Sequence, residues 1–518
     1  MIMYFRSINI VNRVRSFYKS LLLNNSKGLK RFHKSAIILI IGWNVLCSGG
    51  DVDKELRVSV DLDVGEVQNI KLINGKTVEI KLIDVVEKYD KFNLAIRSAK
   101  ARVSVNGQDV WLNSANYNLP VTAGDVQIDC PITKGYLEKS RRNAWGLLKD
   151  ARFRLWPADS PFVKSGTFVY PIKQRWFASE TQMSNEPVFV DGGERPDKES
   201  IYYHSGLDFG GSEEMDKVVS ATDGLVITAG RDSLPGYEDT PGKPAYDAVW
   251  ILDERGWFIG YYHLFSIDSA VKPGARISMG QKIGRLGKEG SSGGWAHLHF
   301  QIRCKQPSGE WGDEDGYAFL WESYIRQYNP SVIAVARPHQ VAAVGQTIML
   351  DGRKSKSVKG EITTYEWTLT DGTTASGPTA EQVYTKPGTY SEVLKVVNSD
   401  GSIDYDFAHV QVIDKKHPDK ISPAIHANYH PTNNIKAGDA VTFKVRTFRT
   451  ESGSEVWDFG DGSPPVNVKS VIPKKRIAGK YAETIHSYEK AGHYIVKVKR
   501  TGEYGYEATA HLHVEVLP

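Results

Sequence analysis

An internal repeat in the last third of this 518-residue chain constrains its fold more than any other feature. The segment Tyr365–Gly372 is echoed by Val456–Gly462, because both carry a Trp early and end in an Asp-Gly pair. Each copy then continues into a strand in which apolar and polar residues alternate. A strand-and-turn unit that occurs twice predicts two tandem β-sandwiches, which we place at residues 331–416 and 417–518.

The residues before this repeat also favour strands. Residues 51–165 contain short alternating runs that are broken by Asn74-Gly75 and Asn106-Gly107. Alternation with a period of two indicates strands, and Asn-Gly pairs favour tight hairpin turns. This β-rich module shows no recognisable chemistry, so we expect it to pack against or shape the next domain. Residues 166–330 are rich in Gly and aromatic residues, and the fold class predicted for the chain is mainly β.

The uneven distribution of charge argues against a nucleic-acid partner. Lys and Arg number 65 against 61 Asp and Glu, but eight basic residues and no acidic one lie in residues 1–47. The rest of the chain therefore holds 57 basic and 61 acidic residues. A folded part with a slight acidic excess lacks the basic surface that binding to a phosphate backbone requires.

Residues 1–50 have the plan of an export signal. The basic stretch is followed by a mainly apolar run, Ser35–Cys47, and then by small residues. The run is shorter than the roughly 20 residues that a membrane-spanning helix needs. We therefore expect export to the periplasm, the cell envelope or the extracellular space, with residues 1–50 acting as a signal peptide or as an N-terminal membrane anchor.

Cysteine is scarce in this chain. Of the three cysteines, Cys47 lies in the leader, which leaves Cys130 and Cys304. Two residues exclude a disulfide-built scaffold and a zinc cluster made of thiolates. They either form one disulfide in an oxidising compartment or remain as isolated thiols.

The candidate chemistry lies in residues 166–330, where histidines occur on expected strands. His204 and Asp208 are four residues apart, and the intervening Gly206 favours a strand or a tight turn over a helix. In the segment Trp295–Arg303 the alternation predicts a strand that points His297 and His299 to the same face.

A third segment adds His263, which follows the expected strand Phe258–Tyr262. Two imidazoles and one carboxylate suit tetrahedral Zn²⁺, and catalytic sites leave the fourth position to water. Such a site lowers the pKa of the water to about 7 and polarises a peptide carbonyl, while further histidines transfer protons. Each motif alone occurs by chance in a chain with 14 histidines. Their occurrence together favours a metal site over coincidence.

The order of these motifs resembles that of lysostaphin-type zinc endopeptidases, the LytM or Gly-Gly endopeptidase class of peptidoglycan hydrolases. The segments that carry the resemblance, within about residues 166–330, are His204–Phe209, Val218–Val226, Gly260–Leu264, Val271–Gly284, Gly287–Gly293 and His297–Phe300. The resemblance implies an antiparallel β-sheet groove and one Zn²⁺ per chain, held by His204, Asp208 and His299. It also implies His297 as the general base, and His263 as the residue that stabilises the oxyanion or assists proton transfer.

Some segments depart from the family pattern. Trp295-Ala296 stand where the family usually carries a small residue and often Pro, and Arg231–Asp247 looks like an expanded loop that walls the substrate groove. Tyr237, Tyr246 and Trp295 either line that groove or simply cover loops. The run Asp313–Gly316 lacks the spaced ligands of a calcium loop and is predicted to be a solvated turn.

The second sandwich resembles PKD-type (polycystic kidney disease) repeats, since Trp457, Asp458 and the pattern Tyr488–Tyr494 match that family. The first copy is degenerate, with Thr368 and Thr370 where the family has Asp and Gly. The resemblance implies spacer or adhesive modules that bind an envelope or matrix ligand. We expect the histidines of these sandwiches to have no part in catalysis.

These observations together predict an exported zinc metallo-endopeptidase. The family resemblance implies peptide bridges or stems of bacterial peptidoglycan as the substrate. Two alternatives remain open at this point. One is a secreted protease of Gly-rich extracellular proteins, and the other is a non-catalytic scaffold or binding protein of the cell envelope.

Overall fold

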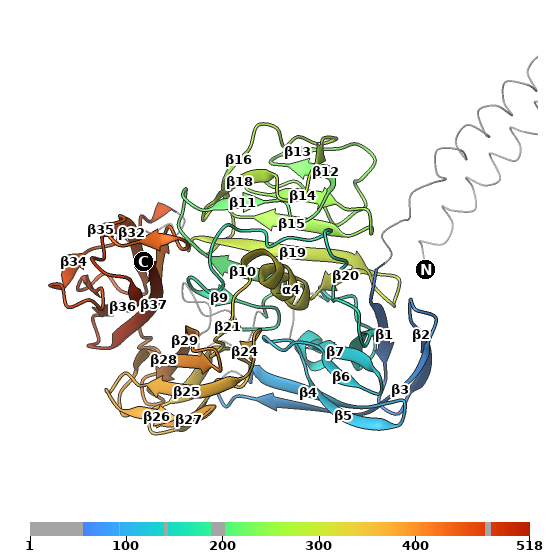
Figure 1. Ribbon diagram of the computed structural model, residues 1–518, viewed down its shortest axis with the longest axis horizontal. Coiled ribbons are helices and arrows are strands. Elements are labelled where there is room, and N and C mark those ends of the chain that lie inside the picture. Colours follow the sequence, from blue (N-terminus) through green and yellow to red (C-terminus); the bar gives the residue numbers. More distant parts are fainter. Residues whose placement is uncertain (1–54, 93, 139–142, 188–202, 472–477) are drawn as a thin grey trace, which may run out of the picture. The chain divides into compact units, whose positions relative to one another are not determined.

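The computed structural model describes residues 55–92, 94–138, 143–187, 203–471 and 478–518 (Figure 1). The predicted leader, with its signal peptide or anchor, lies outside the described residues. Residues Glu55–Pro518 belong to one unit. Among the described residues, the helices are too short or too polar to span a membrane. Strands dominate throughout, which confirms the prediction of a mainly β protein.

The N-terminal module consists of two antiparallel sheets with the strand orders β1-β8-β7-β6 and β2-β3-β4-β5. Its elements are β1 (Val58–Leu62), β2 (Val67–Lys71), β3 (Thr77–Tyr89), β4 (Ile96–Val105), β5 (Gln108–Asn113), β6 (Val121–Ala123), β7 (Val126–Thr133), α3 (Gly135–Glu138) and β8 (Ala151–Pro157). The predicted hairpin at Asn106-Gly107 joins β4 to β5. Both residues have positive φ, 49° and 82°, as a tight turn between twisted strands requires.

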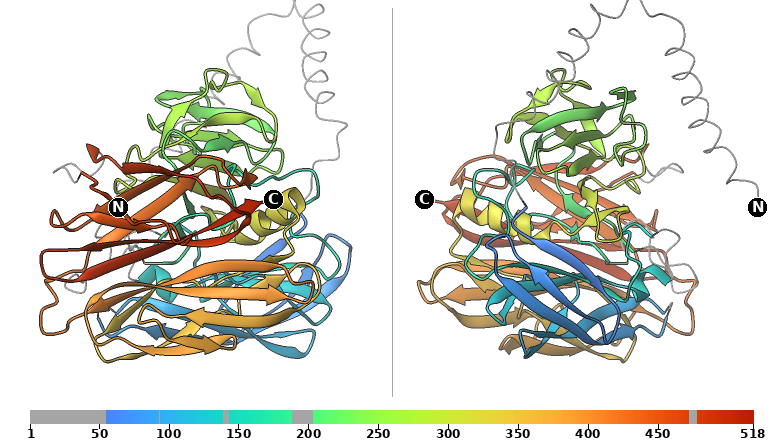
Figure 2. Two further views of the ribbon diagram at one scale, coloured as in Figure 1. Left: turned by 60° about the vertical axis from the view of Figure 1, so that its left-hand side comes forward. Right: turned by 90° about the vertical axis from the view of Figure 1, so that its right-hand side faces the viewer.

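The central domain is built around a sheet with the order β13-β12-β14-β15-β19-β10-β9, together with a smaller sheet β11-β18-β16. Its elements are β9 (Thr181–Gln182), β10 (Leu207–Gly210), β11 (Lys217–Val219), β12 (Gly224–Ala229), β13 (Asp232–Ser233), β14 (Val249–Leu252), β15 (Phe258–Tyr262), β16 (Leu264–Ile267), β17 (Arg276–Ile277), β18 (Lys282–Leu286), β19 (His297–Lys305), β20 (Trp311–Glu314) and α4 (Tyr317–Tyr328). Helix α4, which no sequence pattern above predicted, contributes Phe319 and Leu320 to the same core as Phe300 of β19. Figure 2 shows the arrangement of the ribbon from two further directions.

The C-terminal repeats form sandwiches around Trp367 and Trp457, which are both fully buried. The first contains β21 (Val332–Ile333), β22 (Gln340–Ala343), β23 (Thr347–Asp351), β24 (Lys356–Ser357), β25 (Ile362–Thr368), β26 (Thr374–Ser376), β27 (Thr379–Val383), β28 (Gly388–Asn398) and β29 (Ile403–Ile413). The second contains β30 (Ala424–His430), β31 (Ile435–Lys436), β32 (Val441–Phe448), β33 (Glu455–Asp458), β34 (Val466–Val468), β35 (Ala482–His486), β36 (Gly492–Thr501) and β37 (Glu507–Leu517). The start of β28 pairs with the start of β37, so one sheet runs through both repeats.

The prediction of a solvated turn at Asp313–Gly316 is wrong. Asp313 and Glu314 belong to β20, and both side chains are buried, as is Asp315. The cause is an ion-pair network that sequence spacing does not show. Arg154 of the N-terminal module is fully buried and lies 2.6 Å from the Glu314 carboxylate and 2.5 Å from that of Asp129. Arginine forks of this kind allow acidic residues to be buried.

Candidate metal centre and active site

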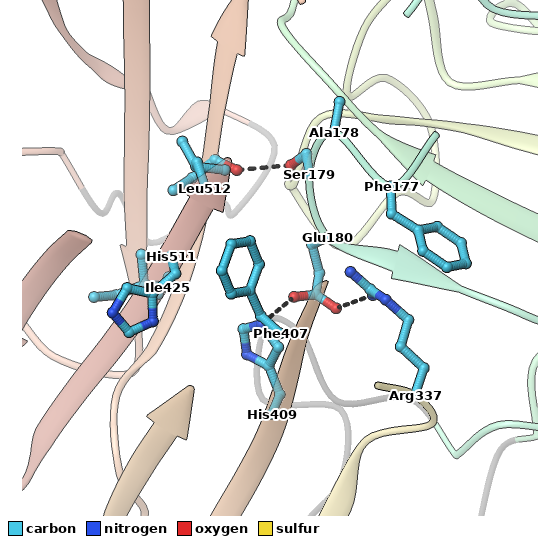
Figure 3. A pocket seen from close by; sticks show the side chains of 12 residues that line it. Phe177, Ala178, Ser179, Glu180, Arg337, Phe407, His409, Ile425, His511 and Leu512 are labelled. Atoms are coloured by element: carbon cyan, nitrogen blue, oxygen red, sulfur yellow. Dashed lines mark hydrogen bonds and ion pairs between the residues drawn. The ribbon is translucent and has the colours of Figure 1, made fainter. Parts of the chain in front are cut away.

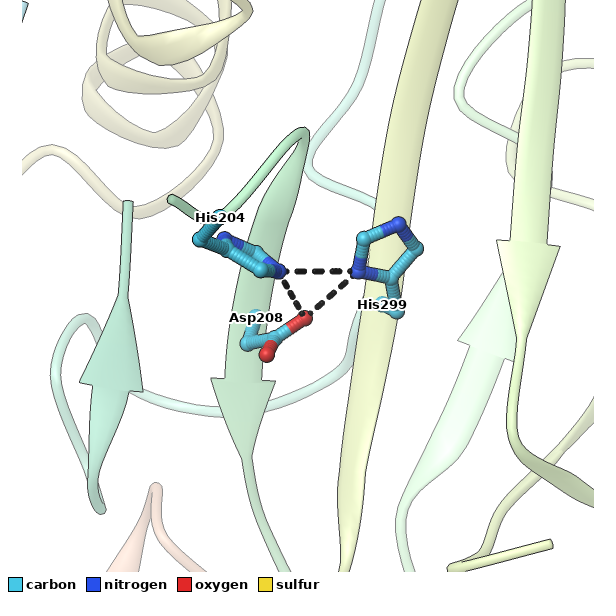
Figure 4. Close-up of side chains that lie close together, drawn as sticks. All are labelled: His204, Asp208 and His299. Atoms are coloured by element: carbon cyan, nitrogen blue, oxygen red, sulfur yellow. Dashed lines mark hydrogen bonds and ion pairs between the residues drawn. The ribbon is translucent and has the colours of Figure 1, made fainter. Parts of the chain in front are cut away.

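The register of the central sheet brings His204, Asp208 and His299 together. Asp208 of β10 lies directly opposite His299 of β19, and His204 precedes β10 by three residues. The atoms His204 Nε2, His299 Nδ1 and Asp208 Oδ1 are mutually 2.8 to 3.0 Å apart (Figure 4). The structure therefore gathers the three residues that the sequence analysis proposed as ligands.

The chemistry and spacing of these three donors fit zinc. A tetrahedral zinc ion with bonds of about 2.0–2.1 Å has ligand atoms about 3.3 Å apart, a few tenths of an ångström more than the spacing here. Among the described residues, this trio is the group of His, Cys, Asp or Glu whose ligand atoms converge closely enough to hold a metal. His204 Nδ1 lies 3.3 Å from the Met183 carbonyl, which accepts its proton and leaves Nε2 for the metal.

Gly206 makes this convergence possible, which explains the His-Ser-Gly-Leu-Asp sequence. Its φ of +88° turns the chain between His204 and Asp208. A Cβ at this position would lie 2.8 Å from the Phe300 carbonyl oxygen and 3.1 Å from the His299 ring. A larger residue would therefore displace the imidazole of His299.

His297 lies beside the trio rather than within it. Its side chain enters from the start of β19, and its Nε2 lies 3.4 Å from Asp208 Oδ2, the other oxygen of that carboxylate. The predicted alternation of β19 is confirmed, since Leu298 and Phe300 are fully buried on the opposite face. His297 Nδ1 lies 3.0 Å from the Trp295 carbonyl and donates to it, which fixes Nε2 as the basic nitrogen.

His263 completes the cluster from the position that directly follows β15, with its ring 4.6 Å from that of His297. It has a φ of 65°, an uncommon conformation for a residue other than Gly. Asp247 holds this conformation, because its Oδ2 lies 3.2 Å from both the backbone nitrogen and Nδ1 of His263. The Glu289 carbonyl accepts from the same Nδ1 at 2.8 Å. A Cβ on Gly290 would lie 2.2 Å from the Asp247 carboxylate, so that position requires glycine.

Burial sets the electrostatics of the site. It lowers the pKa of His297 well below the usual value, and the neighbouring His263 acts in the same direction. Burial also lowers the pKa of His299. Burial alone would raise the pKa of Asp208, but the charge of His204 and the hydrogen bonds from His204 and His299 hold it well below its usual value. The arrangement therefore favours an ionised Asp208 beside a neutral His297, as a ligand and a general base require.

The structure also places the remaining sequence candidates. Trp295 is buried and stacks on the ring of His297, so it supports the site rather than lining an open groove. Tyr246 is 45% exposed, and its hydroxyl accepts from the Gly290 nitrogen. Cys130 and Cys304 are both buried free thiols, which leaves the second of the two cysteine alternatives. The supporting roles of Asp247 and of the Met183 carbonyl had no signal in the sequence.

Comparisons with known proteins agree with these observations. Residues 202–309 match peptidase family M23, and residues 329–412 and 426–516 each match a PKD domain. Among curated proteins, collagenase ColA of Clostridium perfringens is 32% identical over 83 residues, which are 16% of this chain and 8% of the collagenase. The chain thus spans only a small part of that relative.

Two solved structures are similar to parts of this chain. One is the catalytic domain of the prophage-encoded M23 protein EnpA from Enterococcus faecalis, with 21% identity, coverage of 30% of this chain and 93% of that chain, and a TM-score of 0.18. The other is lysostaphin, with 17% identity, coverage of 67% of this chain and 92% of that chain, and a TM-score of 0.23.

Proposed function

We propose that this chain, which carries a peptidase family M23 domain followed by two PKD domains, is an exported zinc metallo-endopeptidase. We further propose that its substrate is the peptide bridges or stems of bacterial peptidoglycan. The observation that carries the proposal is the convergence of His204, Asp208 and His299 beside the neutral His297 within the residues that match the peptidase family. The basic and apolar leader of the sequence supports export.

The proposed mechanism assigns separate roles to the two histidines outside the trio. When bound by His204, Asp208 and His299, zinc would supply a Lewis acid for the scissile carbonyl and a water of pKa about 7. His297 Nε2 accepts a proton from the attacking water and later returns it to the leaving amine. His263 donates from Nε2–H to the oxyanion of the tetrahedral intermediate. Because Nδ1 already donates to Asp247 and to the Glu289 carbonyl, this role requires a ring that carries protons on both nitrogens.

A non-catalytic scaffold explains these features less well. A scaffold needs no neutral imidazole beside an ionised ligand, and it needs no support for His263 in an uncommon backbone conformation. A secreted protease of Gly-rich proteins remains the second candidate. The 83-residue similarity to a protein named as a collagenase favours testing it, although that similarity covers 8% of the relative.

The decisive experiment is mass spectrometry of the fragments released from purified peptidoglycan, with a Gly-rich protein such as denatured collagen tested in parallel. The matched control is His297→Gln, which keeps a polar side chain of similar size and is expected to retain zinc. New peptide termini that appear with the wild type alone establish the endopeptidase and identify the bond. Release from the Gly-rich protein alone would favour the second candidate, and release from neither would contradict the proposed activity.

A further inference from the structure

The second PKD repeat packs against the peptidase domain through one face of its sheet β30-β32-β35. Alternate residues of β30 point to this interface. His426 contacts Ser179 at 3.1 Å, Asn428 contacts Ser212 at 2.6 Å, and His430 contacts Asp216 at 2.8 Å. Figure 3 shows the adjoining junction, where Ser179 donates to the backbone of the repeat.

The interface reaches the segment that leads into His297. The Ala296 backbone nitrogen donates to the Tyr481 hydroxyl at 2.8 Å, and that hydroxyl donates to His426 Nδ1 at 2.6 Å. The other ring nitrogen of His426 then donates to Ser179, whose hydroxyl donates onward to the Ala427 carbonyl at 2.6 Å. Each member of this chain donates and accepts consistently only if the His426 ring is neutral. Burial favours that state by lowering the pKa of His426 to about 3.

A second bond fixes the other side of the same segment. Arg446 of β32 donates from its guanidinium to the Gly294 carbonyl. The backbone on both sides of Trp295 is therefore bonded to the repeat. Phe448, also on β32, packs against the indole of Trp295, which the ring of His426 contacts edge-on at 5.1 Å.

Trp295 in turn holds the imidazole of His297 by two contacts. The indole stacks on the ring at a centroid distance of 3.9 Å and an interplanar angle of 18°. The Trp295 carbonyl accepts from Nδ1 at 3.0 Å. Together these contacts fix the plane of the ring and the tautomer, so they direct Nε2 toward the Asp208 side of the site.

Gly210 provides independent support for a close fit between the repeat and the site. This residue follows Asp208 on β10. A Cβ here would lie 2.8 Å from His426 Nε2 and 2.3 Å from the Glu180 carbonyl oxygen. The glycine therefore allows the side chain of the repeat to lie directly against the strand that carries a proposed ligand.

We propose that the second PKD repeat is a positioning element of the active site, in which Tyr481, His426 and Arg446 hold residues 294–296 and thereby orient the general base His297. This inference rests on the proposed function, because it assigns the orientation to a catalytic role. It differs from the expectation that the histidines of the sandwiches have no part in catalysis. It also distinguishes this repeat from a spacer, which would leave the peptidase domain complete without it.

The test compares two Tyr→Phe variants of the full-length protein that each remove one buried hydroxyl from the same repeat. Tyr481→Phe deletes the acceptor for Ala296, whereas Tyr488→Phe deletes a hydroxyl that donates to Phe459 within the repeat. We expect Tyr481→Phe to lower kcat about 10-fold, with KM within twofold and zinc content unchanged. Trp295→Leu, which removes the stacking contact, should lower kcat by about 100-fold. Tyr488→Phe should retain wild-type kcat.

A spectroscopic readout that is independent of turnover accompanies the kinetics. Long-range ¹H–¹⁵N spectra of histidine-labelled protein report the tautomer of each ring, and the His297 signal is identified by its absence from His297→Gln. We expect this signal to shift in Tyr481→Phe and to stay in place in Tyr488→Phe. An unmoved His297 signal in Tyr481→Phe, or an equal fall in kcat in both Tyr→Phe variants, would overturn the inference. If the wild type cleaves no substrate, the proposed function fails, and the His297 signal still decides the question of positioning.

Discussion

Replacement of Arg154 by Met tests whether buried ion pairs hold the N-terminal module on the peptidase domain. The guanidinium is fully buried and contacts the carboxylates of Asp129 and Glu314 as well as the Asp315 carbonyl, all within 3.0 Å. Met keeps most of the apolar volume but leaves Asp129 without its main counter-charge, and leaves Glu314 with Arg57 alone at 3.0 Å. Breaking a buried pair in this way costs about 3–5 kcal/mol.

The matched control is Arg102→Met in the same module. Arg102 and Asp109 form an ion pair of 2.7 Å, but their side chains are 45% and 44% exposed. Exposed pairs contribute about 0–1 kcal/mol, so this variant should unfold almost like the wild type. With about 3 kcal/mol per molar urea, Arg154→Met should lower the urea midpoint by about 1–2 M. Equal midpoints for the two variants would refute the reasoning.

The pH dependence of the Arg154→Met defect gives a second check. Burial raises the pKa of Asp315 to about 6, above the unfolded value of about 4. A carboxyl with a raised folded pKa costs stability as the pH rises through this window, because the folded state must then ionise it. Loss of the Arg154 charge raises the pKa further. The difference between variant and wild type should therefore be larger at pH 8 than at pH 5, and a difference independent of pH would contradict the assignment.

Three further predictions test the site and the repeats. His299→Ala should remove zinc, whereas His297→Ala should retain zinc and lose turnover. Elemental analysis measures the zinc content, and peptide release measures turnover. Zinc loss in both variants would contradict the assigned roles. Gly206→Ala should weaken zinc binding more than Gly236→Ala. Both glycines have φ near +90°, but only a Cβ at position 206 would lie against the His299 ring. Equal zinc affinities of the two variants would contradict this explanation. Burial lowers the pKa of His511 to about 3. Below about pH 6.5 this histidine is therefore protonated in the unfolded chain but stays neutral in the folded chain, so the free energy of unfolding falls as the pH falls. His511 should contribute about 1.4 kcal/mol per pH unit to the fall in the free energy of unfolding between pH 6 and 4, and urea titrations of His511→Asn should lack this contribution. The same pH dependence of the unfolding free energy in the variant and the wild type would count against this origin.

Local patterns were sufficient to predict much of the site. Alternation along β19 placed His297 and His299 on one face, and the glycine between His204 and Asp208 indicated a turn into a strand. These features depend on neighbours in sequence, so a single chain reveals them. The motif order added the expectation that the three segments meet.

Features that depend on distant partners were not predictable in this way. The acidic run at Asp313 resembles a solvated turn until Arg154, far away in sequence, is known to lie beside it. Asp247 ended an apparent surface loop, yet its carboxylate holds His263. His426 resembled an ordinary sandwich histidine because its contact with Trp295 crosses a domain boundary. In each case the role of the residue depends on a contact with residues that are distant in the sequence and meet it only in the folded chain.

The pairing of β28 with β37 has a mechanical consequence for the protein as a whole. Gly388 and Thr389 lie beside Glu507 and Ala508, so the backbone hydrogen bonds of one sheet cross from one repeat to the other. Domains joined by flexible linkers move apart under tension, but these two sandwiches cannot separate without breaking the backbone hydrogen bonds between β28 and β37. A ligand held by either repeat would therefore keep the peptidase at a fixed reach.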